Sequence, residues 1–342
     1  MNRKNIWIHL TIAVVLITLA ALMGQIERWK SALRGPNTET TRRVEKTVPV
    51  AKKALEGTPE VIVRFRPGFT LDKIRAIAST NNDSLTDEIE AVNGLTFIDD
   101  LDNADAQAVA NQYSAMTSAV LYAEVNNQIK LDDPKQTEVP RDLLLREPPA
   151  GMPNDPLFGE QWALNNLGQD GGKERADLDA INAWATTKGS DEVVVAVLDS
   201  GVDYTHVDLV GNMWVRPKNV PAYTDDELGT FNDLNGYNGT DKDTDPMDDN
   251  GHGTHCAGII GAEGDNGEGI TGINQKIKIM PLKFLGRGGF GSTNDAIEAI
   301  NYAIDRKKNG VNVRIISASW GSTARSQALE DTIRAAGDAG IL

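Results

Sequence analysis

Val193-Val194-Val195-Ala196-Val197-Leu198-Asp199 is a run of six apolar residues that ends on an aspartate. An unbroken apolar run of this length is typical of a strand that is buried on both faces of a parallel sheet. Similar runs lie at 277–284 and 313–317. Between them, apolar residues at helical spacing fill 296–304 after the capping sequence Ser292-Thr293-Asn294-Asp295. Because strands alternate with helices, we expect an α/β fold built on a doubly wound parallel sheet.

Asp199 stands at the carboxyl end of the first predicted strand, where polar side chains collect in parallel sheets. Taken alone, an aspartate before Ser-Gly more often caps a turn. The segment 250–258, Asn-Gly-His-Gly-Thr-His-Cys-Ala-Gly, changes that interpretation because it places His252 between two glycines at the start of a predicted helix. A carboxylate near a histidine fixes the ring tautomer and stabilises the imidazolium that forms when the ring takes a proton from a nucleophile.

The two histidines of this segment also allow simpler interpretations. His252 and His255 could be structural, or could bind a metal ion together, although a third ligand at a recognisable spacing is missing. Cys256 is the single cysteine of the chain, so an internal disulfide is excluded. Its position favours a small buried apolar side chain over a nucleophile.

Segments 195–203 and 251–258 closely resemble, in sequence and in order, the aspartate and histidine motifs of the subtilisin family of serine proteases. The resemblance implies a subtilisin-like catalytic domain over 154–342. It implies an endopeptidase acting on proteins or peptides, in which Asp199 orients His252 as the general base. It also implies that the substrate backbone lies between two strands that include Gly289, Gly291, Ser319, Trp320 and Gly321.

The nucleophile of that family lies in a Gly-Thr-Ser-Met-Ala motif about 150 residues after the histidine. No Gly-Thr-Ser follows His252, and we assign the nucleophile to none of the serines between 253 and 342. We therefore expect a fragment whose catalytic domain is incomplete at its C-terminus and which is inactive as it stands. The alternative is a non-catalytic module that binds or inhibits proteases.

The N-terminal residues have the pattern of an exported protein. Arg3 and Lys4 precede an apolar run over 6–24. Residues 1–24 are therefore expected to be a signal peptide or a membrane anchor that tethers the chain through 6–24. The predicted location is secreted or extracytoplasmic.

A separate small domain precedes the predicted catalytic domain. Two strand–helix–strand passages in 60–131 predict an α+β, ferredoxin-like arrangement. Residues 25–59 and 132–153 read as linkers, the second rich in proline and suited to processing. The family resemblance implies that 60–131 is an inhibitory propeptide of a zymogen, which acts as the intramolecular inhibitor of its own catalytic domain.

Acidic residues dominate the composition, with 49 Asp and Glu against 34 Lys and Arg and a formal net charge of −15. This balance argues against nucleic acid as a partner and favours bound cations. Resemblance to thermitase-like members of the family implies a calcium loop with Asp241, Asp243 and Asp245, for which a solvated acidic loop is the other interpretation. A second calcium site of the family would use Asp208 and Asn266. No organic cofactor is implied.

Overall fold

The computed structural model of the chain describes residues 61–131, 152–225, 229–240, 245–322 and 324–342. The predictions made for 1–24, for 25–59 and for most of 132–153 lie outside these residues. In the part of the chain that is described, no helix is both long enough and apolar enough to cross a membrane.

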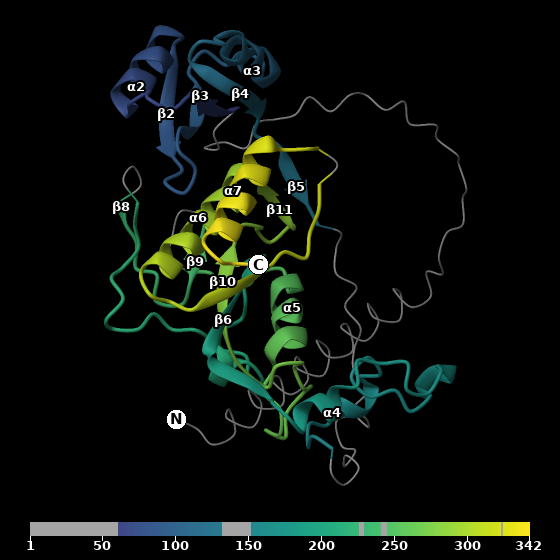
Figure 1. Cartoon of the computed structure of the whole chain (residues 1–342). Coiled ribbons are helices and arrows are strands. Elements are labelled where there is room, and N and C mark those ends of the chain that lie inside the picture. Colours follow the sequence, from purple (N-terminus) through teal and green to yellow (C-terminus); the bar gives the residue numbers. More distant parts are fainter. Residues whose placement is uncertain (1–60, 132–151, 226–228, 241–244, 323) are drawn as a thin grey trace, which may run out of the picture. The chain divides into compact units, whose positions relative to one another are not determined.

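Residues 61–131 form a four-stranded antiparallel sheet with two helices, drawn in blue in Figure 1. The strand order β2-β3-β1-β4 is that of the predicted ferredoxin-like arrangement. The core between sheet and helices contains Val63, Phe65, Ile74 and Tyr113. In chain order the elements are β1 (Val61–Phe65), α2 (Leu71–Thr80), β2 (Asp83–Glu88), β3 (Leu95–Asp100), α3 (Ala106–Ala115) and β4 (Val120–Val125).

Strand β2 is the one strand of this sheet that the sequence pattern does not predict. Its sequence, Asp-Ser-Leu-Thr-Asp-Glu, is polar because β2 is an edge strand that pairs with β3 alone. Asp83 is nevertheless buried, and the Tyr113 hydroxyl donates a 2.6 Å hydrogen bond to its carboxylate. Pairing with β3 and burial against α3 therefore define this strand, and neither leaves a signal in the local sequence.

The second region contains the predicted parallel sheet, with strand order β12-β6-β10-β9. Its neighbouring strands are parallel at each pairing. The strands are β6 (Gly189–Asp199), β9 (Tyr237–Asn238), β10 (Lys276–Lys283) and β12 (Val313–Ser317), and the long helices are α5 (His252–Gly261), α6 (Thr293–Lys308) and α7 (Gln327–Asp338). Helix α6 begins at a capping box formed by Ser292 and Asp295, as the sequence predicts.

Helices cover both faces of this sheet. Ala196 and Leu198 of β6 pack in one core cluster with Ile300 of α6, whereas Val195 and Val197 pack in another with α5. Successive residues of a strand point to opposite faces, so the unbroken apolar run of β6 supplies both cores. The predicted doubly wound α/β fold is confirmed.

Shorter elements connect these parts: β5 (Gln128–Lys130), α4 (Ala180–Trp184), β7 (Thr224–Asp225), β8 (Gly229–Thr230) and β11 (Phe290–Ser292). Single 3-10 turns lie at Phe158–Glu160, Gln169–Gly171 and Val210–Asn212. Strand β5 extends from the first region and pairs antiparallel with β11, with Ile129 opposite Gly291.

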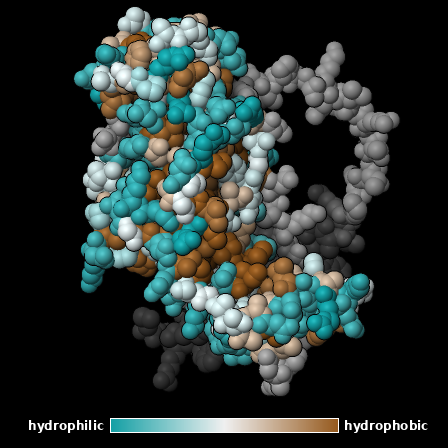
Figure 2. Space-filling model, in the orientation of Figure 1, coloured by the Kyte–Doolittle hydropathy of each residue, from teal (hydrophilic) through white to brown (hydrophobic). Residues whose placement is uncertain are grey.

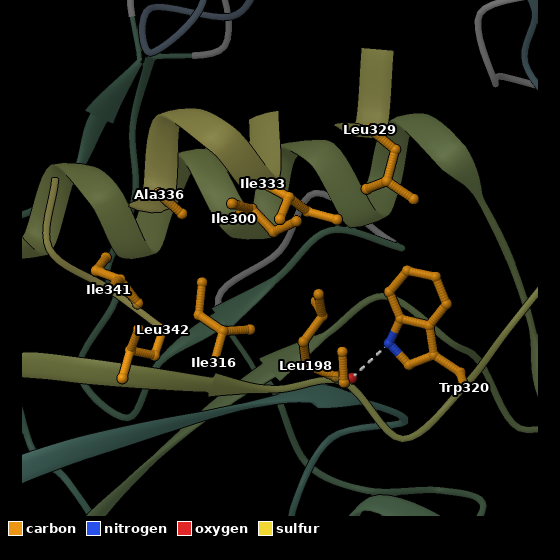
Figure 3. A pocket seen from close by; sticks show the side chains of 10 residues that line it. Leu198, Ile300, Ile316, Trp320, Leu329, Ile333, Ala336, Ile341 and Leu342 are labelled. Atoms are coloured by element: carbon orange, nitrogen blue, oxygen red, sulfur yellow. Dashed lines mark hydrogen bonds between the residues drawn. The ribbon is translucent and has the colours of Figure 1, made fainter. Parts of the chain in front are cut away.

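An apolar hollow of about 290 Å³ lies between α6, α7 and the sheet edge at β12. Leu198, Ile316 and Trp320 line its sheet side, and Ile300 and Ile333 line its helix side (Figure 3). Figure 2 shows apolar side chains, in brown, gathered on this face. The hollow therefore lies directly beside the strand that ends in Asp199.

Candidate active site

Asp199 and His252 meet at the carboxyl end of β6. Asp199 is fully buried, and its Oδ1 lies 2.8 Å from Nδ1 of His252, the first residue of α5. The imidazole stays partly exposed, with 25% of the side chain accessible. Because the carboxylate holds Nδ1 as a donor, Nε2 is the nitrogen that is left to accept a proton.

Two glycines permit this close approach. Gly201 has a φ of 99°, and a Cβ there would lie 2.4 Å from the carbonyl oxygen of Pro246. A Cβ on Gly253 would lie 2.1 Å from the carbonyl oxygen of Gly201. A side chain on Gly253 would push the start of α5 away from the end of β6, and one on Gly201 would displace the segment 246–248 that leads into α5, so both glycines serve the contact between Asp199 and His252.

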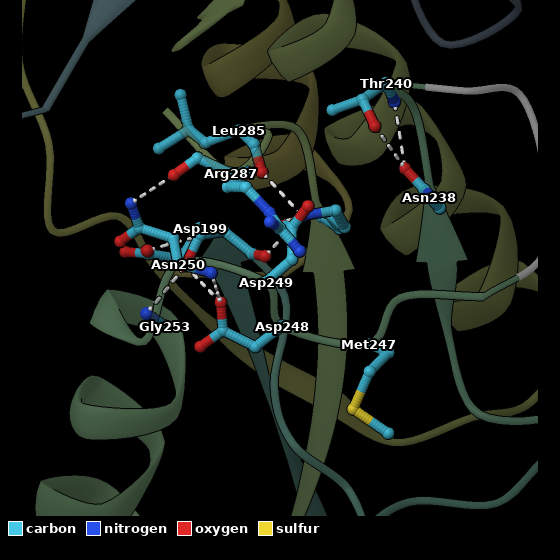
Figure 4. Close-up of polar contacts among 12 residues, drawn as sticks. Asp199, Asn238, Thr240, Met247, Asp248, Asp249, Asn250, Gly253, Leu285 and Arg287 are labelled. Atoms are coloured by element: carbon cyan, nitrogen blue, oxygen red, sulfur yellow. Dashed lines mark hydrogen bonds and ion pairs between the residues drawn. The ribbon is translucent and has the colours of Figure 1, made fainter. Parts of the chain in front are cut away.

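Asp248 organises the turn that leads into α5 (Figure 4). Its Oδ1 accepts hydrogen bonds of 2.9 Å from the Ser200 hydroxyl and from the backbone N–H groups of Asn250 and Gly251. Its Oδ2 accepts bonds from the N–H and the hydroxyl of Thr254. Burial alone would raise the pKa of Asp248, but these donors outweigh it and hold the pKa below its ordinary value.

The buried side chain of Lys283 connects three parts of the site. Its side chain is 4% exposed, and Nζ donates to the carbonyl oxygens of Ser200 at 2.7 Å and Leu285 at 2.8 Å, and to the Asp249 carboxylate at 2.6 Å. The buried ammonium therefore joins the end of β6, the turn before α5 and the start of segment 285–291, which contains the predicted substrate-binding residues Gly289 and Gly291. The ammonium group has three N–H donors, and three oxygen atoms accept from it.

The roles of Asp248 and Lys283 are not apparent from the sequence. Asp248 lies in the acidic segment 225–249, which contains eight other Asp and Glu residues. The signal that could have identified it is an aspartate a few residues before a helix start, which commonly receives the first N–H groups of the helix. Lys283 left no such signal, because its partners come from segments far away in the chain.

Cys256 and His255 differ in their relation to His252. Cys256 Sγ lies 3.9 Å from Nδ1 of His252, and burial raises the pKa of this thiol although the Ser319 hydroxyl bonds to it. A thiol with a raised pKa is a poor nucleophile. His255 is exposed, and the possible metal ligands grouped with His252 among the described residues are Asp199 and Cys256. The structure does not bring His255 into a shared site with His252.

The predicted substrate strand is paired within this chain. Gly291 lies opposite Ile129 in the pairing of β11 with β5, and the Gly289 carbonyl oxygen accepts a 2.8 Å bond from the N–H of Leu131. A Cβ on Gly291 would lie 2.1 Å from the Phe284 carbonyl oxygen, so only glycine fits there. The Asn250 side chain donates to the Arg287 carbonyl oxygen at 3.0 Å and ties this loop to the turn before His252 (Figure 4).

The second predicted substrate segment, residues 319–321, does not pair with a described strand of the first region. Ser319 and Gly321 are exposed, and in the described residues β5 forms its ladder with β11 rather than with this segment. Trp320 is half-buried; its indole N–H donates to the Leu198 carbonyl oxygen at 2.9 Å, and its ring lies 4.8 Å from that of Phe284. The contacts of Trp320 are therefore packing contacts with the sheet.

The predicted calcium ligand Asp208 is buried and faces the loop that contains Asn266. Its two oxygens accept bonds of 2.9 Å from the Asn266 side chain and the Ile270 N–H. Burial raises the pKa of Asp208, and the charge of Asp155 adds to the rise. Each Asp208 oxygen keeps a lone pair beyond these bonds and would suit calcium, whereas the Asn266 side chain presents its N–H group to Asp208 and its oxygen to the Glu268 N–H.

The other predicted calcium loop is only partly described. Asp245 accepts hydrogen bonds from the Tyr204 hydroxyl at 3.0 Å and from the Met247 N–H at 3.1 Å. Asp241 and Asp243 lie outside the described residues.

Comparison with known proteins shows what the second region of this chain resembles. Residues 190–342 match the model of the subtilase family. A cell wall-associated protease of Bacillus subtilis (strain 168) is 37% identical over 166 residues, which cover 48% of this chain and 17% of that protein. A thermophilic serine proteinase of Bacillus sp. (strain AK1) is 35% identical over 187 residues, 54% of this chain and 40% of the relative. The chain thus spans less than half the length of these relatives.

Among solved structures, fervidolysin from Fervidobacterium pennivorans, described as a keratinolytic enzyme related to subtilisin, is similar with a TM-score of 0.58. The two are 20% identical, and the match covers 83% of this chain and 39% of that one. At this identity the likeness shows the fold. Together with the matched family model and the relatives, it shows what this chain is similar to: residues 190–342 resemble the subtilase family in sequence and in fold.

Proposed function

We propose that this chain supplies the acid and base of a serine endopeptidase. The observation that carries the proposal is the 2.8 Å contact between the buried Asp199 carboxylate and Nδ1 of His252. In this mechanism Nε2 of His252 takes the proton of a serine hydroxyl as the oxygen attacks the peptide carbonyl carbon, and then gives it to the leaving amine. Water hydrolyses the acyl-enzyme in the second half of the cycle.

We assign the nucleophile to none of the serines that follow His252 in the described residues. Ser292 and Ser326 cap α6 and α7, and the Ser319 hydroxyl bonds to the Cys256 thiol. Asp199 and His252 would therefore act on a serine that lies outside the described residues. Proteins or peptides are the proposed substrates, and the exposed edge of β11 would align their backbone when β5 is absent.

We further propose that residues 61–131 inhibit this site as a propeptide. Support comes from the pairing of β5 with β11, which occupies the strand edge that a substrate would use. A second contact lies at α7, where the Glu124 carboxylate accepts bonds from the Ser326 hydroxyl and from the N–H groups of Gln327 and Ala328. A carboxylate at a helix N-terminus is stabilised by the free N–H groups there.

Two proposals concern the surroundings of the enzyme. Calcium held by Asp208 and the Asn266 loop would join segments that are distant in sequence, and the Asp245 turn would contribute to a second site.

The cell wall association named for the Bacillus subtilis relative supports a secreted or extracytoplasmic location for this chain as well.

The test is to produce the protein from its complete reading frame and to assay hydrolysis of a casein substrate. We expect hydrolysis that is abolished by a fluorophosphonate, which labels activated serines, and that survives 1,10-phenanthroline, which removes zinc. Absence of hydrolysis after removal of 61–131 would favour a non-catalytic binding module. Loss of hydrolysis with 1,10-phenanthroline alone would favour a zinc site at His252.

A further inference from the structure

Three carboxylates lie buried together between the first region and the rest of the chain, away from the candidate active site. Asp87 belongs to β2, Asp225 to β7 and Glu298 to α6, and their exposed fractions are 2%, 1% and 5%. One oxygen from each lies within 4.8 Å of the others. Three ionised carboxylates so close in a buried place repel one another strongly unless a positive charge joins them.

Glu298 shows that the cluster is short of a partner. Both of its carboxylate oxygens are buried, and within the described residues the one group that shares a hydrogen bond with them is the neighbouring acid Asp87. After burial itself, the groups that act most strongly on Glu298 are Asp87, Asp225 and Glu90, all of them acidic. A buried carboxylate that no N–H group of the described residues contacts and that faces two further carboxylates has the features of a cation ligand.

We propose that Asp87, Asp225 and Glu298 hold a divalent cation, most suitably calcium, that fastens residues 61–131 to the rest of the chain. Calcium binds oxygen at about 2.4 Å, so two ligand atoms on opposite sides of the ion stand about 4.8 Å apart. The spacing of the three oxygens therefore fits one shared centre. Magnesium needs a tighter octahedron, and zinc prefers nitrogen and sulfur ligands, which this set does not offer.

The neighbouring contacts indicate what the ion would do. The Asn301 side chain, one turn after Glu298 on α6, accepts a 3.1 Å bond from the N–H of Ala91 and donates to the Glu90 carboxylate. The segment that follows β2 is thus already placed against α6. An ion bound by Asp87 from one side and by Asp225 and Glu298 from the other would strengthen that contact and would be released when 61–131 leaves.

The test uses the full chain, stripped with EDTA and titrated with calcium by calorimetry. Glu298→Gln keeps the shape of the side chain and removes its charge, so we expect a folded variant that binds one calcium ion fewer than the wild type. Any ion at Asp208 is present in both proteins and cancels in the comparison. The control is Glu330→Gln, a partly exposed carboxylate of α7 that pairs with Arg325, which should leave the stoichiometry unchanged.

Hydrogen exchange provides the second readout, and neither readout depends on peptidase activity. At a calcium concentration 100 times its Kd, backbone exchange over 83–91 should slow by about 100-fold in the wild type, because opening must release the ion. Glu298→Gln should show no calcium effect there. Equal stoichiometry in wild type and Glu298→Gln, or an equal calcium effect on 83–91 in both, would overturn the proposal and leave a shared proton as the means by which the cluster is neutralised.

Discussion

Lys283 stands opposite Asp199 in the parallel pairing of β10 with β6. Asp199 contacts His252, and Lys283 holds the turn after β6 through its hydrogen bond to the Ser200 carbonyl oxygen. The candidate catalytic aspartate is thus fixed by its own strand and by a buried ammonium on the neighbouring strand.

Replacing Lys283 by Met should destabilise the protein by about 3 kcal/mol, because two buried carbonyl oxygens lose their donor and Asp249 loses its counter-charge. Urea unfolding followed by circular dichroism measures the change. Lys278→Met on the same strand is the matched control; Lys278 bonds to one carbonyl oxygen and is more exposed, so about 1 kcal/mol is expected. Equal losses in the two variants would contradict the role given to Lys283.

Asp248→Ala should disorder the turn before α5. Five donors lose their acceptor, and those of Ser200, Gly251 and Thr254 lie next to the candidate catalytic pair. We expect a loss of about 2–3 kcal/mol in unfolding free energy and faster backbone exchange over 248–254. Asp72→Ala, which removes an exposed carboxylate far from this turn, should change neither quantity. Unchanged exchange over 248–254 in Asp248→Ala would show that the turn is held by other contacts.

The same residue predicts a dependence of stability on pH. Because the pKa of Asp248 is lower in the folded protein than its ordinary value of about 3.9, ionised Asp248 stabilises the fold above that pH. This contribution is lost as the pH falls through the folded pKa. Urea midpoints measured between about pH 5 and pH 2 should therefore fall more steeply for the wild type than for Asp248→Asn. If the urea midpoints of the two proteins fall in parallel with pH, ionisation of Asp248 does not contribute to the pH dependence of stability.

Contacts at α7 should determine how firmly residues 61–131 stay in place. Glu124→Ala removes the acceptor of three donors at the α7 N-terminus, and we expect backbone exchange over 120–131 to rise by about tenfold or more. Asp102→Ala, an exposed carboxylate of the same region, serves as control. If both variants exchange alike, β5 is held on β11 by its own ladder alone.

The sequence predicts the parts of this protein whose signals are local. The apolar run of β6 and the capping box of α6 each lie within a few residues, and the histidine motif lies in a single segment. By contrast, β2 is polar and exists through pairing with β3. The buried cluster of Asp87, Asp225 and Glu298 joins segments more than 70 residues apart, so no window of sequence reveals it. In the sequence Lys283 looks like an ordinary strand residue, and its role follows from the three oxygen acceptors that the structure places around it.

The most direct test of the central claim is a double-mutant comparison of kcat/KM in the protein produced from its complete reading frame. If Asp199 acts through His252, Asp199→Asn should lower kcat/KM by about 10⁴-fold, and Asp199→Asn combined with His252→Ala should be no worse than His252→Ala alone. Independent losses that multiply in the double variant, or full hydrolysis by His252→Ala, would contradict the account.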